Sequence, residues 1–178
     1  MTEKKGLYEK AKDEMRLSER ILAALPGFRG YKEKELRRES DRLIRNHLYG
    51  KLQKARSDLK EVFQKLSQER RHEVLNDMDQ LVTKYDRVAE KINHASYGYA
   101  GFYNVVKIEE DKLDKMIEFD SQLIDEVETV AAVASDFKKE IGKRGFEKAK
   151  DHIQKVADAL ETLEDTFDQR EEVILGVK

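Results

Sequence analysis

The chain has 178 residues, of which 40% are charged and 39% hydrophobic, and its formal net charge is −2. It contains no cysteine, which excludes disulfide bonds and thiolate metal sites, and no apolar run approaches the ~20 residues of a membrane-spanning helix. The N-terminal stretch lacks the apolar core of a signal peptide, so we expect one cytoplasmic domain covering residues 1–178.

Apolar residues recur at steps of three and four along most of the chain, which is the spacing of one face of an α-helix. Nearly balanced charges and a periodicity that persists to the C-terminus argue against disorder. Alternating β-branched runs are absent, and Pro26 is the only proline. The pattern therefore predicts an all-α protein.

The first predicted helix covers about residues 3–24, and Leu22 and Leu25 lie late in its apolar stripe. The sequence LPGFRG ends this helix, because Pro26 removes a backbone donor and Gly27 and Gly30 allow positive φ.

The second predicted helix covers about residues 31–66 and the third about 68–93. The sequence SQER interrupts the pattern between them, and Ser67 is a candidate N-cap for the third helix. No Gly or Pro rules out one continuous helix here. The two stripes consist of Leu48, Leu52, Ala55, Leu59, Val62 and Leu66, and of Leu75, Met78, Val82, Tyr85, Ala89 and Ile92.

The fourth predicted helix covers about residues 107–141, and GKRG separates it from a fifth helix over about 146–171. The fourth stripe contains Leu113, Met116, Asp120, Leu123, Val127, Val130, Ala134, Phe137 and Ile141. The fifth contains Phe146, Ala149, Ile153, Val156, Leu160, Leu163 and Phe167.

A period near 3.5 residues makes a narrow apolar seam that packs against partner helices with shallow crossing. Short turns between such helices favour up-and-down packing. We therefore predict an elongated, antiparallel bundle of four to five long helices with coiled-coil-like packing, whose longest helix spans about 50 Å.

Two turns carry a resemblance to known proteins. The stretch LPGFRGYKEKELRRESDRLIR and, much later, YGYAGFYNVVKIEEDKLDKMIEFD resemble a family of uncharacterised helical-bundle proteins encoded in prokaryotic genomes. The resemblance covers about a quarter of the chain. It implies a shared helical fold and carries no established activity.

Asp120 is a carboxylate in an apolar stripe, between Met116 and Leu123. An unpaired buried carboxylate is costly, which leaves three alternatives. The stripe shifts to Phe119 and Asp120 lies at its margin, or Asp120 is buried in a register-fixing pair with an arginine or His47, or it takes part in catalysis. A paired Asp120 is expected to have a lowered pKa.

Residues 93–107, NHASYGYAGFYNVVK, carry one formal charge and four aromatic rings. In the structural interpretation these rings cap one end of the bundle, while Gly98 and Gly101 reverse the chain. In the functional interpretation they form a stacking or peptide-binding surface. The sequence PGFRGY adds two further rings to either arrangement. The candidate end-cap or interaction residues are Phe28, Tyr31, Tyr97, Tyr99, Phe102 and Tyr103.

Motifs for metal binding or catalysis are scarce. A carboxylate-bridged di-metal bundle needs two Glu-x-x-His pairs and two further Glu, whereas this sequence has one such pair, Glu69 and His72, beside two arginines. Glu90 and His94 lie four residues apart and fit a surface pair at a helix end. We therefore predict no catalytic, cofactor-binding or metal-binding residue and no cofactor.

Charge is distributed unevenly, with a balance of +6 over residues 29–56 and −6 over both 107–128 and 158–172. Neighbouring helices within one molecule could match these charges, or a basic helix of one copy could meet an acidic helix of another. The stretch FRGYKEKELRR could also dock on an anionic membrane surface. The acidic segments and the negative net charge disfavour nucleic acid as a partner.

These features favour a non-enzymatic helical scaffold or adaptor that oligomerises or binds a helical partner protein. One alternative is an enzyme, or a metal or small-molecule binder, with a site in the bundle core near Asp120. The other is a peripheral membrane organiser.

Overall fold

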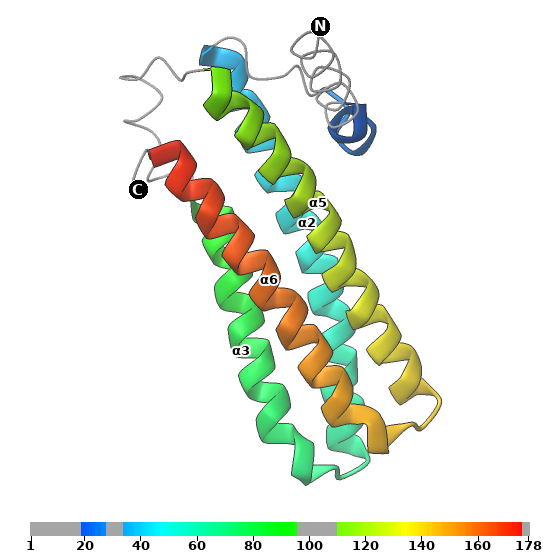
Figure 1. Cartoon of the computed structure of the whole chain (residues 1–178). Coiled ribbons are helices and arrows are strands. Elements are labelled where there is room, and N and C mark those ends of the chain that lie inside the picture. Colours follow the sequence, from blue (N-terminus) through cyan, green and yellow to red (C-terminus); the bar gives the residue numbers. More distant parts are fainter. Residues whose placement is uncertain (1–18, 28–33, 96–109, 176–178) are drawn as a thin grey trace, which may run out of the picture.

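A computed structural model describes residues 19–27, 34–95 and 110–175 of the chain. Four long helices dominate this part (Figure 1): α2 (Lys34–Gln68), α3 (His72–His94), α5 (Glu110–Gly142) and α6 (Ala149–Leu175). A short 3-10 helix, η2 (Phe146–Lys148), precedes α6, and residues 19–24 are also helical. The described residues contain no strand, which confirms the predicted all-α bundle.

The four long helices form a closed ring of neighbours, in which α2 packs on α3 and α5, and α6 packs on the same two helices. Figure 1 shows that α2 and α5 run in one direction and α3 and α6 in the other. The pairs α2/α3 and α5/α6 are therefore antiparallel, whereas α2/α5 and α3/α6 are parallel. The predicted alternation of direction along the chain is present, but α3 and α5, which follow each other in sequence, lie at opposite corners.

The apolar stripes predicted for the second, fourth and fifth helices face the core wherever their side chains are described. Every predicted stripe residue of α2 from position 48 to 66 is buried, as is every one from 116 to 141 in α5 and from 146 to 167 in η2 and α6. Burial of these side chains is the main driving force for packing the helices. None of the described helices is both long and apolar enough to cross a membrane.

Two stripes differ from the prediction. On α3, Leu75 and Val82 are only half-buried, because the stripe that faces the core is shifted. It consists of Val74, Met78, Leu81, Tyr85, Val88, Ala89 and Ile92. In the first helical segment the predicted Leu25 is buried, but Leu22 is 49% exposed and Ile21 takes its place in the core.

A turn interrupts the helical backbone between α2 and α3, so these are two separate helices. Arg70 takes a left-handed backbone conformation with a φ of 56°. Its N–H donates to the Ser67 carbonyl at 3.0 Å, and the Arg71 N–H donates to the Leu66 carbonyl at 3.0 Å, which is the Schellman pattern of a helix C-terminus. Ser67 therefore belongs to the last turn of α2, and the prediction that it caps α3 was wrong.

The turn after α5 repeats this geometry. Arg144 has a φ of 66°, its N–H donates to Ile141 at 3.1 Å, and the Gly145 N–H donates to Glu140 at 3.0 Å. A Cβ at Gly145 would lie 2.3 Å from a side-chain oxygen of Glu140, so a larger residue here would have to displace the Glu140 side chain. The left-handed position itself is occupied by an arginine.

Salt bridges follow the interfaces between the helices. Those between parallel neighbours include Lys51–Glu128 at 2.6 Å and Lys138–Asp58 at 2.8 Å for α2/α5, and Lys84–Glu161 at 3.2 Å, Arg87–Glu164 at 2.9 Å and Lys91–Asp168 at 2.5 Å for α3/α6. The unequal charges of the sequence are thus matched between neighbouring helices of one molecule at these positions.

Candidate functional site

A layer of buried ions crosses the bundle near the start of α2. Asp120 on α5 accepts a hydrogen bond from Nε of Arg170 on α6 at 2.6 Å. Nη2 of the same arginine donates to Asp41 on α2 at 2.9 Å, and Asp41 also accepts from Nε of Arg45 at 2.9 Å. All four side chains are buried, and Asp120 and Arg170 have no exposed surface. The layer contains two acids and two bases, so its formal charges balance.

These ions occupy positions of the apolar seam. On α2, Asp41 and Arg45 continue the four-three spacing that leads to Leu48, and on α6 Arg170 lies three residues after Phe167. Extending the stripe of α2 by two steps and that of α6 by one, without demanding an apolar residue, would have found them. The sequence prediction named Asp120 but missed the three other members of the layer, because charged residues at the ends of the α2 and α6 stripes were not counted as part of them.

The ion pair between Asp120 and Arg170 decides between a marginal and a buried position for Asp120. The side chain is fully buried rather than at the margin of the stripe, and it is bonded to Arg170 rather than to His47. Burial raises the pKa of Asp120, while the charge and the hydrogen bond of Arg170 act in the opposite direction. The expectation that pairing would lower this pKa was wrong, because the loss of hydration outweighs the pairing.

His47 lies elsewhere, in a groove between α2 and α5 with a volume of about 540 Å³. It is half-buried, and its pKa is lowered first by this burial and then by the charge of Lys51. Lys51 is itself paired with Glu128 across the groove. His47 is therefore separate from the buried ionic layer.

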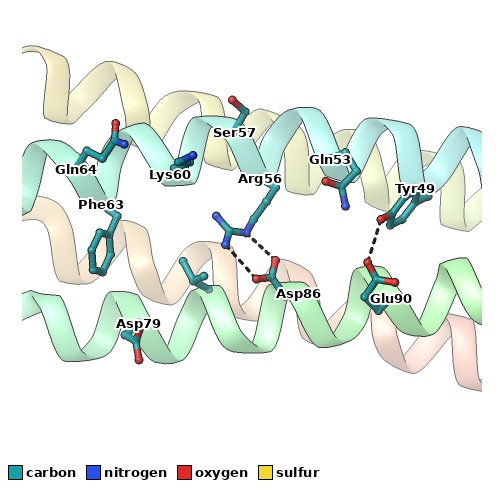
Figure 2. A pocket seen from close by; sticks show the side chains of 11 residues that line it. Tyr49, Gln53, Arg56, Ser57, Lys60, Phe63, Gln64, Asp79, Asp86 and Glu90 are labelled. Atoms are coloured by element: carbon teal, nitrogen blue, oxygen red, sulfur yellow. Dashed lines mark hydrogen bonds and ion pairs between the residues drawn. The ribbon is translucent and has the colours of Figure 1, made fainter.

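A larger groove, with a volume of about 890 Å³, runs between α2 and α3 (Figure 2). Beneath it lies Tyr85, a fully buried ring whose hydroxyl donates to the Leu52 carbonyl of α2 at 2.7 Å. Burial raises the pKa of this hydroxyl far above its usual range. The residues that line the groove are Tyr49, Gln53, Arg56, Ser57, Lys60, Phe63, Gln64, Asp79, Val82, Asp86 and Glu90.

One half of this groove is closed by polar contacts between its two helices. Arg56 donates two hydrogen bonds to Asp86, at 2.6 and 3.0 Å, and the Tyr49 hydroxyl donates to Glu90 at 2.9 Å. The hydrogen bond from Tyr49 lowers the pKa of Glu90, because it favours the ionised carboxylate. These groups are engaged with one another and bridge the groove.

The other half of the groove is open. Phe63 on α2 and Val82 on α3 are half-buried apolar side chains. Lys60 and Asp79 are exposed, and within the described part of the chain neither side chain forms an ion pair. Figure 2 shows Lys60 on α2 and Asp79 on α3, on opposite sides of the groove, with Asp79 displaced along the groove toward the level of Phe63. This half therefore combines an apolar floor with one charge of each sign.

A third feature is a partly buried carboxylate between α5 and α6. Oε1 of Glu126 accepts a hydrogen bond from the Thr166 hydroxyl at 2.7 Å. Its Oε2 is buried and has no hydrogen-bond partner among the described residues. Burial raises the pKa of Glu126, Thr166 opposes the rise, and the nearby charges of Asp125 and Asp165 add to it.

The remaining candidate residues fall into two groups. The six aromatic candidates, Phe28, Tyr31, Tyr97, Tyr99, Phe102 and Tyr103, lie outside the described residues. Glu69 pairs with Lys65 at 3.5 Å, and Glu90 pairs with His94 at 3.0 Å on the exposed end of α3. In the part of the chain that the structure describes, no three His, Asp or Glu side chains gather so as to hold a metal ion.

Comparisons with family models, with curated proteins and with solved structures gave no match to this chain.

Proposed function

We propose that the protein is a non-enzymatic helical scaffold that assembles with a second copy of itself through the α2/α3 groove. The observation that carries this proposal is the open half of the groove, where Phe63 and Val82 form an apolar floor beside the unpaired charges of Lys60 and Asp79. Apolar side chains flanked by polar groups are typical of surfaces that bind another protein.

The charges of the groove favour a second copy over an unrelated partner. A twofold axis that runs along the groove would place α2 of one copy opposite α3 of the other and keep the two rods parallel. Because Lys60 and Asp79 lie on opposite helices of the groove, this operation brings the side that carries each lysine to the side that carries the aspartate of the other copy. A surface with one charge of each sign on its two sides is complementary to itself under this operation.

The apolar floor would supply the attraction. Phe63 and Val82 each keep part of their surface exposed, and covering this surface removes apolar area from water. Aromatic side chains at the centre of an interface often contribute most of its binding energy. The two ion pairs would mainly fix the direction of the partner and the height at which it binds.

The state of the polar groups also supports binding rather than chemistry. Asp120 and Arg170 are bonded to each other inside the core, and in the groove Asp86 and Glu90 are held by Arg56 and Tyr49. Each of these groups already has a partner within the bundle.

Sedimentation equilibrium of the purified chain tests the proposal. We expect a mass of two chains, each of 20.8 kDa, that falls to one chain at low concentration. Phe63→Glu should leave the helical circular dichroism unchanged and shift the protein to one chain, because it places a charge on the floor.

The matched control is Gln122→Glu, which adds the same charge at an exposed position of α5 and should leave the dimer intact. A wild-type protein that stays monomeric at every concentration would contradict the proposal. Equal association of the wild type and the Phe63→Glu variant would contradict it as well.

A further inference from the structure

One end of the bundle is strongly basic. It consists of the turn between α2 and α3 and the turn between α5 and α6, which lie at the same end in Figure 1. We define the turn tip as residues 65–73 and 139–150. It contains eight Lys or Arg against four Asp or Glu, a balance of +4 in a chain whose net charge is −2. The rest of the chain is therefore net acidic, and charge is separated along the rod.

An arginine occupies the left-handed position of each turn. Arg70 has a φ of 56° and Arg144 a φ of 66°, in a region where glycine is favoured and a β-carbon is disfavoured. By contrast, Gly27 takes the left-handed position, with a φ of 98°, where the first helical segment ends. The backbone therefore gives no reason for an arginine at either turn, and a backbone outlier of this kind points to a role of the side chain.

The side chains of Arg70 and Arg144 take part in no ion pair within the described part of the molecule. Arg70 and Arg144 are exposed, and they form no ion pair among the described residues. The same holds for Lys143, which is also exposed. Most other bases of the turn tip are neutralised locally, such as Lys65 by Glu69 at 3.5 Å, whereas Lys150, in the first turn of α6, is exposed and also forms no ion pair among the described residues. Within the two turns themselves, Arg70, Lys143 and Arg144 thus remain available to a partner.

A contact between the two turns fixes their relative position. The guanidinium carbon of Arg71 lies 4.9 Å from the centre of the Phe146 ring, which is a cation–π arrangement. Phe146 is only 8% exposed and belongs to the hydrophobic core. The free cations of both turns are therefore carried on one ordered end rather than on two independent loops.

We propose that the turn tip binds an anionic lipid surface, with Arg70, Arg144 and Lys143 as its contacts. A planar surface can meet all three cations at the end of a rod at once. The net acidic remainder of the chain would be repelled by the same surface, which holds the rod upright. The site is separate from the α2/α3 groove, and in a parallel dimer two turn tips would lie at the same end.

The turn tip differs from the basic stretch FRGYKEKELRR, of which the described part, residues 34–38, begins α2, whereas the turn tip includes the end of that helix. It also differs from a phosphate-binding loop. The N–H groups of Arg70 and Arg71 are already used by carbonyls of α2, and those of Arg144 and Gly145 by carbonyls of α5. The binding groups are therefore side chains alone, which suits a diffuse layer of headgroups.

Co-sedimentation with lipid vesicles tests the proposal. We expect the full chain to bind vesicles that contain phosphatidylserine at low salt and to dissociate from them at high salt. It should not bind vesicles of pure phosphatidylcholine. Each surface cation contributes about fivefold to the partition coefficient, so Arg70→Gly/Arg144→Gly should lower it by about thirtyfold. The same double variant should unfold at an equal or higher temperature, because glycine suits both backbone positions.

The control is Lys54→Gln/Lys115→Gln, which removes the same two charges from exposed positions on the sides of the rod and should retain binding. Equal loss of binding in this control would overturn the proposal, as would unchanged binding of the glycine variant. Displacement by free phosphate at constant ionic strength, or equal affinity for duplex DNA, would overturn the assignment to a lipid surface. The glycine variant should keep the oligomeric mass of the wild type, which separates this test from that of the groove.

Discussion

Replacement of Arg170 by methionine should destabilise the protein more than any surface substitution. Arg170 is fully buried and holds Asp120 at 2.6 Å and Asp41 at 2.9 Å. Methionine reproduces the aliphatic stem of arginine but lacks the guanidinium group, so the substitution leaves the apolar contacts of the stem largely in place. The main consequence is that two buried carboxylates lose an arginine.

The size of the loss in stability depends on which carboxylate is left without a cation. Removing one partner of a buried ion pair typically costs about 3–5 kcal/mol. Asp41 keeps its bond to Arg45 at 2.9 Å, whereas Asp120 loses the arginine that opposes its desolvation. We therefore expect Arg170→Met to lower the free energy of unfolding by about 4 kcal/mol, mostly through Asp120.

A second substitution separates the charge from the packing. Buried ion pairs can often be replaced by apolar residues without loss of stability. Arg170→Met/Asp120→Leu removes the acid together with the base, so its stability should return to within about 1 kcal/mol of the wild type. The non-additivity between the two substitutions measures their interaction.

Urea unfolding followed by circular dichroism gives these free energies, provided that the slope against denaturant is unchanged. Arg42→Met serves as the control. Arg42 is exposed on the same turn of α2 as Asp41, so this substitution should change stability by no more than about 0.5 kcal/mol. A loss below about 1 kcal/mol for Arg170→Met would refute the reasoning. So would a double variant whose loss equals the sum of the two single losses.

Three further predictions concern the core and the loops. Leu59→Ala and Leu160→Ala should each cost about 2–5 kcal/mol in urea unfolding, whereas Leu22→Ala should stay within about 0.5 kcal/mol, since Leu22 is 49% exposed. Burial raises the pKa of Glu126 above its ordinary value of 4.5, so its ionisation opposes folding at higher pH. Glu126→Gln should therefore stabilise the protein at neutral pH, and a gain that persists well below pH 4.5 would contradict this cause. Phe102→Ala should cost about 3 kcal/mol if Phe102 caps the bundle, or about 0.5 kcal/mol if it belongs to a docking surface.

The helices and most of their buried faces could be predicted from the sequence, because a three-four spacing has one structural meaning when it persists over several turns. The shifted face of α3 could not. Leu75 and Val82 lie beside the true core positions Val74 and Leu81, and both sets have helical spacing. Only contact with the other helices decides which set is covered.

The arrangement of the helices around the core was also beyond the sequence. All the apolar stripes look alike, so their spacing does not say that α2 neighbours α5 or that α3 and α5 occupy opposite corners. The pairing within the ionic layer was missed for a related reason. Extended stripes would place Asp41 and Arg170 at core positions, but these residues come from distant parts of the chain, and only folding brings them into one layer with Asp120.

Arg70 and Arg144 show a different limit of prediction from sequence. Sequence reasoning expects glycine where a helix ends in a left-handed residue, and this holds at Gly27. At Arg70 and Arg144 the expected signal is missing, although GKRG still marked the end of α5 by its composition. At these two positions the backbone preference for glycine is not followed, and we assign the presence of arginine to the proposed lipid contact of its side chain.

A mixing experiment with two charge variants tests the proposed assembly most directly. Lys60→Asp alone gives the open half of each groove two acids, and Asp79→Lys alone gives it two bases, so neither variant should associate with itself. In a mixture, every introduced charge would face its opposite across the twofold axis. Sedimentation of the mixture should therefore show a heterodimer with the mass of two chains, each of 20.8 kDa. Two variants that stay monomeric together, while the wild type dimerises, would show that the α2/α3 groove is not the surface through which the copies assemble.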